Sequence, residues 1–79
     1  MSRYFFDIED GRSSRDDEGT NLPNLQGVRG QAVQMLGQVL RDRSVSFWDD
    51  PELRLTVRDD GDLILMRLTV FGTLAPAMR

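Results

Sequence analysis

The sequence contains no histidine, no cysteine and no lysine among its 79 residues. A nucleophilic Ser, Thr or Cys needs a neighbouring base, and that base is usually histidine. A pair of carboxylates is able to do acid-base chemistry, but it needs a deep cleft that gives the two acids different environments. A chain this short rarely builds such a cleft. We therefore predict that the protein is not an enzyme.

The lack of cysteine and histidine also excludes disulfides and a Cys/His zinc site as sources of stability. Only oxygen ligands remain, and the acidic clusters do not match a calcium loop. Counting an EF-hand loop from Asp59 places Val70 at the twelfth position, where glutamate is required. No phosphate-binding glycine motif is present either. We expect no metal and no cofactor.

The charge balance and the short apolar runs exclude two further classes of partner. Ten arginines face 13 acidic residues, which gives a net charge of -3. An acidic domain is a poor general binder of nucleic acid, because duplex affinity comes mostly from neutralising phosphates. The longest apolar run, residues 63–66, is far too short to span a membrane. Residues 3–8 have the composition of a strand rather than of a signal peptide. We expect a cytoplasmic protein without membrane association.

Two hairpins are predicted, one at each side of a helix. Residues 4–9 are rich in strand formers, and Asp10-Gly11 suits a two-residue turn that would pair Ile8 with Ser13. Residues 52–58 alternate strictly between apolar and polar side chains, and Asp60-Gly61 has the same turn chemistry. That second turn predicts three apolar cross-strand pairs on one face of the sheet: Val57 with Ile64, Leu55 with Met66, and Leu53 with Leu68.

Between the hairpins, Asn24 is the expected N-cap of an amphipathic helix over residues 25–41. Gly19, in the acidic turn before the helix, is expected to have a positive φ. One apolar stripe of the helix should face the sheet: Leu25, Val28, Ala32, Met35, Leu36 and Val39. The aromatic pair Phe47 and Trp48 should fold over the end of the core.

Together these elements predict a two-layer α+β fold, ββαββ, in which four mostly antiparallel strands pack on one helix. Residues 1–72 form the single domain, and residues 73–79 form a frayed C-terminal tail. The strand order is left open by the sequence. A domain of this size without a disulfide or metal often gains stability from a second chain, so we expect a homodimer.

The chain opens with Arg3-Tyr4-Phe5-Phe6 and continues through Glu18-Gly19-Thr20 and Leu22-Pro23 to Leu25. In this combination it resembles domain of unknown function 6894, a family of short, mostly alphaproteobacterial proteins. These begin with Arg-Tyr-Phe-Phe and run through Glu-Gly-Thr-x-Leu-Pro-x-Leu into an Ala-rich helix. The resemblance extends over nearly the whole chain up to Phe71. It implies a fold and a bacterial source, but no activity.

A weaker likeness is to HicB-type antitoxins, which pair an N-terminal hairpin with a Pro-x-Leu-x-Gly start of a helix. Residues 22–27 follow this pattern loosely, although the acidic first turn of the helix is missing. The alternative function implied by this likeness is an antitoxin that inhibits a small RNA-cleaving toxin.

If the helix covers one face of the sheet, the other face is open. It would carry Asp7 and Glu9, which are able to pair with Arg54 or Arg67 across strands. The last predicted strand is apolar on both faces, which a strand buried on one face does not need. We therefore predict an interaction surface that includes Phe5, Leu63, Leu65, Arg67 and Phe71.

The function predicted from these features is a non-enzymatic regulatory or adaptor module that acts through a protein-protein interface. Its partners would be a second copy of the chain and an unidentified protein. Aromatic and arginine residues on an open sheet are also typical of platforms for single-stranded RNA. The acidic charge balance argues against that alternative.

Overall fold

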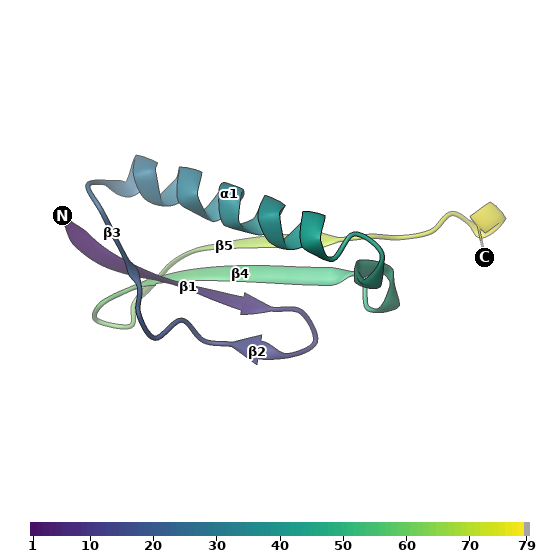
Figure 1. The fold of residues 1–79 in the computed structure, drawn as a ribbon, viewed down its shortest axis with the longest axis horizontal. Coiled ribbons are helices and arrows are strands. Elements are labelled where there is room, and N and C mark those ends of the chain that lie inside the picture. The colour runs from purple at the N-terminus through teal and green to yellow at the C-terminus, as the bar shows by residue number, and fades with distance from the viewer. Residues whose placement is uncertain (79) are drawn as a thin grey trace.

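The computed structural model describes residues 1–78 as one long helix packed on one face of a five-stranded sheet (Figure 1). This confirms the α+β class, with five strands in place of the four predicted. The elements in chain order are β1 (Ser2–Glu9), β2 (Ser13–Ser14), β3 (Thr20–Leu22), α1 (Leu25–Asp42), the 3-10 helix η1 (Ser46–Asp49), β4 (Glu52–Asp59), β5 (Ile64–Phe71) and the 3-10 helix η2 (Pro76–Met78).

The strand order, which the sequence left open, is β2-β1-β4-β5, with β3 also paired to β1. Every pairing is antiparallel. Tyr4 pairs with Thr20 of β3 and with Asp59 of β4, so β3 and β4 lie on opposite edges of β1. Strands β2 and β3 are therefore two pieces of one interrupted edge strand, and β5 is the opposite edge of the sheet.

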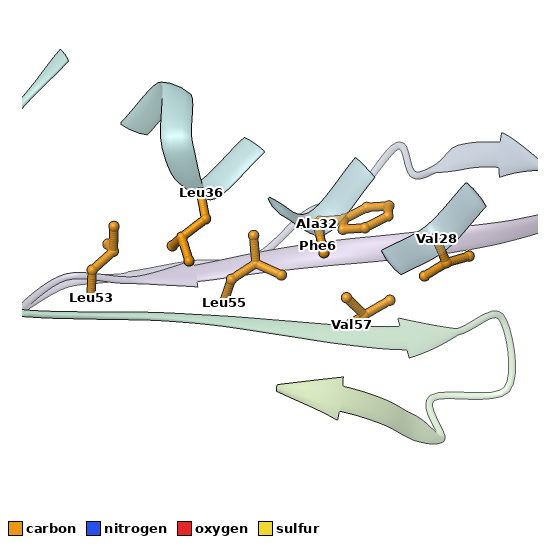
Figure 2. Packing of buried hydrophobic residues seen from close by; sticks show 7 residues of the cluster. All are labelled: Phe6, Val28, Ala32, Leu36, Leu53, Leu55 and Val57. Carbon is orange, nitrogen blue, oxygen red and sulfur yellow. The ribbon is translucent and has the colours of Figure 1, made fainter. Parts of the chain in front are cut away.

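The hydrophobic core lies between α1 and the two central strands. Figure 2 shows its seven side chains pointing toward one another. The helix contributes three of them and β4 another three, which are fully or almost fully buried: Val28, Ala32, Leu36, Leu53, Leu55 and Val57. Phe6 of β1, 3% exposed, is the seventh. Tyr4 and Ile8 pack against this cluster from the same face of β1, as the alternation predicts.

The helix begins where the sequence predicts. The side-chain oxygen of Asn24 accepts a hydrogen bond from Gly27 N at 2.8 Å, which satisfies one of the first free N–H groups of the helix. The predicted apolar stripe faces the sheet with one exception. Leu25, the first residue of α1, is 50% exposed, whereas Val28 one turn later is fully buried.

The first hairpin differs from the prediction by one residue. Ile8 pairs with Ser14, and Glu9 with Ser13, so the loop has three residues instead of two. A two-residue turn of type I′ requires positive φ at both central residues. Only Gly11 of the pair has a positive φ, at 93°, and Asp10 does not. The Asp10 carboxylate instead forms an ion pair with Arg43 at the end of α1.

The second hairpin also lacks the predicted turn at Asp60-Gly61. Asp62 N donates to Asp59 O at 3.1 Å, and the positive φ, 67°, falls on Asp62. The Asp59 side chain accepts hydrogen bonds from Gly61 N and Leu63 N, both at 2.9 Å. This is a three-residue loop closed by a left-handed residue, a common alternative to the two-residue turn.

A bulge in β5 shifts the register by one further residue. Arg58 pairs with Ile64, but Val57 pairs with Met66, which leaves Leu65 without a partner in β4. The pairs predicted for Leu53, Leu55 and Val57 are therefore wrong. These residues lie opposite Val70, Leu68 and Met66. Each of these three residues lies opposite a β5 residue two positions beyond the predicted one. A shift of two residues keeps the partner on the same face, so the core face of β4 still meets apolar side chains of β5.

The end of the core is closed as predicted for Phe47, which packs against the buried cluster. Trp48 is 48% exposed and stands edge-on to Phe47, with 5.6 Å between ring centroids. A Cβ at Gly72 would lie 2.8 Å from the Trp48 ring, so the absence of a side chain there allows the ring to pack. The predicted fraying of residues 73–79 stays a prediction. The segment includes η2, and residue 79 lies outside the described residues.

Leu55 provides the test of the core. Its side chain is fully buried, so Leu55→Ala should lower the free energy of unfolding by about 2 to 5 kcal/mol through lost contacts and a residual cavity. Thermal unfolding followed by circular dichroism measures the change. An unchanged melting temperature would contradict the packing of α1 on β4.

Candidate functional site

A buried arginine organises the open face of the sheet. Arg58 of β4 is only 8% exposed. Its Nε donates to Asp7 Oδ2 at 2.9 Å, and one terminal nitrogen donates to Asp16 O at 2.7 Å. The other terminal nitrogen donates to Asp62 Oδ1 at 3.0 Å. The guanidinium carbon lies 4.6 Å from the centre of the Phe5 ring, within the range of a cation–π contact.

Asp16 fills the gap between β2 and β3. One carboxylate oxygen accepts a hydrogen bond from Phe6 N at 3.1 Å, in place of a continuous edge strand. The other oxygen accepts from Glu18 N and Gly19 N, also at 3.1 Å. Asp16 N in turn donates to Asp7 Oδ1 at 2.9 Å. The acidic turn is thus part of the sheet rather than a free loop.

These contacts shift two ionisation equilibria. Burial alone would raise the pKa of Asp16, but hydrogen bonds from Gly19, Phe6 and Glu18 and the charge of Arg58 outweigh it. The pKa of Asp16 is therefore held below its ordinary value of 3.8. The hydrogen bond to Asp7, opposed by burial and aided by the charges of Asp7 and Asp62, raises the pKa of Arg58.

A shallow groove of about 310 Å³ runs over this network on the open face. Its lining has three arginines and three carboxylates, so its charges balance: Asp7, Glu9, Ser13, Arg15, Thr56, Arg58, Asp62, Ile64 and Arg67. Asp7 is occupied by Arg58 and by Asp16 N, which leaves it unsuited to act as a free base. Within residues 1–78, no group of three or more acidic side chains is arranged to hold a metal ion.

The outer edge of β5 is the second candidate surface. Gly72 N donates to Pro51 O at 2.9 Å, which fixes the direction of the backbone at the end of this strand. Because backbone groups alternate along a strand, the N–H and C=O groups of Arg67, Thr69 and Phe71 point away from β4. No other strand of the described chain pairs with this edge.

The five residues predicted for the interaction surface are only partly brought together. Phe5 lies under the Arg58 guanidinium, away from β5. Leu63 and Phe71 are 62% and 71% exposed, but lie at opposite ends of β5. Leu65 is half-buried at the bulge. Arg67 lines the groove and donates to the Thr56 hydroxyl at 3.2 Å.

The structure adds residues that the sequence reasoning missed. Ile64, predicted on the core face, lies opposite Arg58 and lines the groove with 53% of its surface exposed. The third residue of the loop causes this change of face, and the bulge at Leu65 returns Met66 to the core face. Of the predicted ion pairs, Glu9 does approach Arg54, at 3.8 Å, but Asp7 pairs with Arg58. The sequence does not show that β1 and β4 are adjacent, and this adjacency determines which ion pairs form.

Comparison with protein-family models gives one match, to a domain of unknown function, DUF6894, over residues 3–72. The chain belongs to this family. The matched region includes β1 from Arg3 onward and the whole of β2, β3, α1, β4 and β5. Searches of curated proteins and of solved structures find no match. The antitoxin likeness and the alphaproteobacterial source stay predictions.

No helix within residues 1–78 has the length and apolar character that crossing a bilayer requires. The family description gives no activity. The candidate functional surfaces are therefore the groove on the open face and the edge of β5.

Gly19 offers a test of the turn before the helix. Its φ of 74° is as predicted, and a Cβ would lie 2.8 Å from Arg3 Cγ and 2.9 Å from Phe5 Cε2. Gly19→Ala should therefore destabilise the fold by at least about 1 to 2 kcal/mol. Gly30→Ala is the matched control, since nothing lies within 4 Å of that position in α1. It should stabilise the fold by up to about 1 kcal/mol. Chemical denaturation of both variants measures the two effects, and a stable Gly19→Ala would contradict the structural role of this turn.

Asp16 predicts how stability depends on pH. A carboxyl whose pKa is lowered by folding stabilises the protein above its ordinary pKa, and this contribution is lost as the pH falls through the lowered value. Asp16→Asn should therefore be less stable at pH 7 and should lose less stability between about pH 5 and about pH 2. Melting temperatures across this range measure it, with Asp17→Asn as the exposed neighbouring control. Parallel curves for wild type and Asp16→Asn would contradict the role of the Asp16 carboxylate.

Proposed function

We propose that the protein is a non-enzymatic regulatory or adaptor module that acts through a protein-protein interface, and that the free edge of β5 forms this interface in a homodimer. One observation carries the proposal. Strand β5 is eight residues long, and its outer edge is open along the described chain. An exposed strand edge is a template for pairing with another chain.

The side chains of β5 support this use of the edge. Ile64 and Phe71 are each more than half exposed, and Leu63 just before the strand is 62% exposed. Arg67 is the one charged residue in β5, and the strand contains no proline. Soluble proteins usually protect an exposed edge with several charges, with proline, with a bulge or with a very short strand. Of these devices β5 has only the bulge at Leu65, and the segment from Met66 to Phe71 beyond it is regular, which favours an edge that is covered by a partner.

The chemistry of the groove supports a non-enzymatic role. Asp7 receives hydrogen bonds from Arg58 Nε and from Asp16 N, and Asp62 is bound by Arg58 and by Arg15. The oxygens of these carboxylates are already engaged in hydrogen bonds, which is unsuitable for proton transfer. The chain also has no histidine, cysteine or lysine to supply a base or a nucleophile.

The substitution Thr69→Pro tests the proposal. The N–H of Thr69 points away from β4, so Thr69→Pro removes an edge donor without removing a hydrogen bond from the β4–β5 pairing. The wild type should sediment at micromolar concentration as a dimer of about 18 kDa, twice the chain mass of 9.0 kDa. Thr69→Pro should sediment as a folded monomer, whereas Thr69→Val, which keeps the N–H, should remain a dimer.

Two results would contradict the proposal. A wild type that is monomeric over the micromolar range would contradict the proposed homodimer. An unchanged dimer in folded Thr69→Pro would contradict the β5 edge as its interface. If a monomeric wild type bound a small RNA-cleaving protein encoded by a neighbouring gene, the antitoxin-like alternative would replace the proposal.

A further inference from the structure

We infer that the occupant of the β5 edge is the β5 strand of a second copy, paired antiparallel about a two-fold axis through Thr69. This inference rests on the proposed function and specifies its partner and register. A two-fold axis perpendicular to the sheet places the same face of both copies on the same side. For two residues that lie directly opposite each other, the sum of the residue numbers is then constant, and it is 138 for an axis at Thr69.

The backbone geometry decides how many hydrogen bonds each two-fold axis allows. Only residues whose N–H and C=O groups point outward can form the hydrogen-bonded pairs of a new ladder. In β5 these are Arg67, Thr69 and Phe71. The bulge at Leu65 ends the regular part of the strand on one side, and Gly72 lies at the other end. Thr69 is the centre of the regular segment from Met66 to Gly72, so this axis gives the longest uninterrupted ladder, with about six hydrogen bonds.

On the open face, this register places opposite charges and an aromatic ring in one row. Arg67 would lie opposite Phe71 of the partner subunit, in position for a cation–π contact. Within one chain, Phe71 pairs with Glu52 of β4, whose side chain is 54% exposed. The partner's Glu52 would lie about 10 Å from the Arg67 backbone, two strand spacings away, within reach of an extended arginine. The two-fold axis forms this row twice.

On the core face, the same register joins the apolar rows of the two sheets. Leu68 would lie opposite Val70 of the partner subunit, and Met66 opposite Gly72 of the partner subunit. In the single chain Met66, Leu68 and Val70 are only partly buried, although they pack against the core. Extension of the sheet would cover them further, which adds apolar burial to the backbone hydrogen bonds.

The neighbouring axes are less favourable. Axes at Leu68 and Val70 pass through non-hydrogen-bonded pairs, and within the segment from Met66 to Gly72 each gives about four hydrogen bonds instead of six. An axis at Arg67 would place Arg67 directly opposite Arg67 of the partner subunit, and like charges in that position are destabilising. It would also run the ladder into the bulge at Leu65. An axis at Phe71 would pair Thr69 with Thr73 of the partner subunit, beyond the end of the strand at Phe71.

Single cysteines test this register, because the chain has no cysteine of its own. In Thr69→Cys the two Cα atoms would be about 5.5 Å apart, within the range of a disulfide. Arg67→Cys is the matched control on the same face. Its two Cα atoms would be offset by four residues, about 13 Å, which is too far for a disulfide. Mild oxidation of each folded variant, followed by non-reducing electrophoresis, should give a cross-linked dimer for Thr69→Cys and not for Arg67→Cys.

A mixing experiment gives a second measurement. Equal amounts of Arg67→Cys and Phe71→Cys should form a mixed disulfide on oxidation, while neither variant should cross-link to itself. Cross-linking of Arg67→Cys alone would overturn the inference in favour of an axis at Arg67. A wild type that sediments as a dimer, with no cross-link in Thr69→Cys, would overturn the register and leave the homodimer standing. A monomeric wild type would overturn both.

Discussion

The fold depends on one constraint, which is that a single 18-residue helix has to cover a five-stranded sheet. The helix packs over the centre of the sheet, and the fully buried apolar residues all come from β1, α1 and β4. Strand β5 contributes only partly buried side chains to this cluster. The stability of the domain is therefore concentrated at the two central strands, and the edges of the sheet need other interactions.

The two edges solve this problem in different ways. On one side, the edge strand is divided into the short strands β2 and β3, and Asp16 occupies the gap with its carboxylate and backbone. Short, interrupted strands are poor templates for further pairing. On the other side, β5 is long, and only Arg67 in it is charged. The contrast between the two edges supports the proposal that the chain associates through β5.

The face opposite the helix is organised by a charge instead of by a second layer of apolar residues. Arg58 lies over Phe5 and joins segments that are 51 and 42 residues apart in the chain, through Asp7 and Asp16. A buried guanidinium is costly unless its donors are satisfied, and here Asp7, Asp16 and Asp62 satisfy them. This network fixes the acidic turn and the β4–β5 loop relative to the sheet. The groove above it is a charge-balanced surface.

The sequence by itself determined the helix, its cap at Asn24 and the alternation that buries Leu53, Leu55 and Val57. These features depend on local hydrogen bonds and on side-chain periodicity, which neighbouring residues specify. Gly19 belongs to the same class, since a positive φ before a helix is a local property.

The tertiary structure decided the strand order, the loop lengths and the register of both hairpins. Asp10-Gly11 and Asp60-Gly61 have the residue types of two-residue turns, but each hairpin has a three-residue loop. In the second hairpin Asp59 and Asp62 close this loop through side-chain and left-handed backbone geometry, and its third residue moves Ile64 to the open face. Arg58 is the centre of the candidate site only because β1 lies beside β4. This pairing places Asp7 opposite Thr56, which is next to Arg58 on the same face of β4. Such pairings join residues about 50 positions apart, and nothing in the local sequence specifies which distant strand will supply the partner.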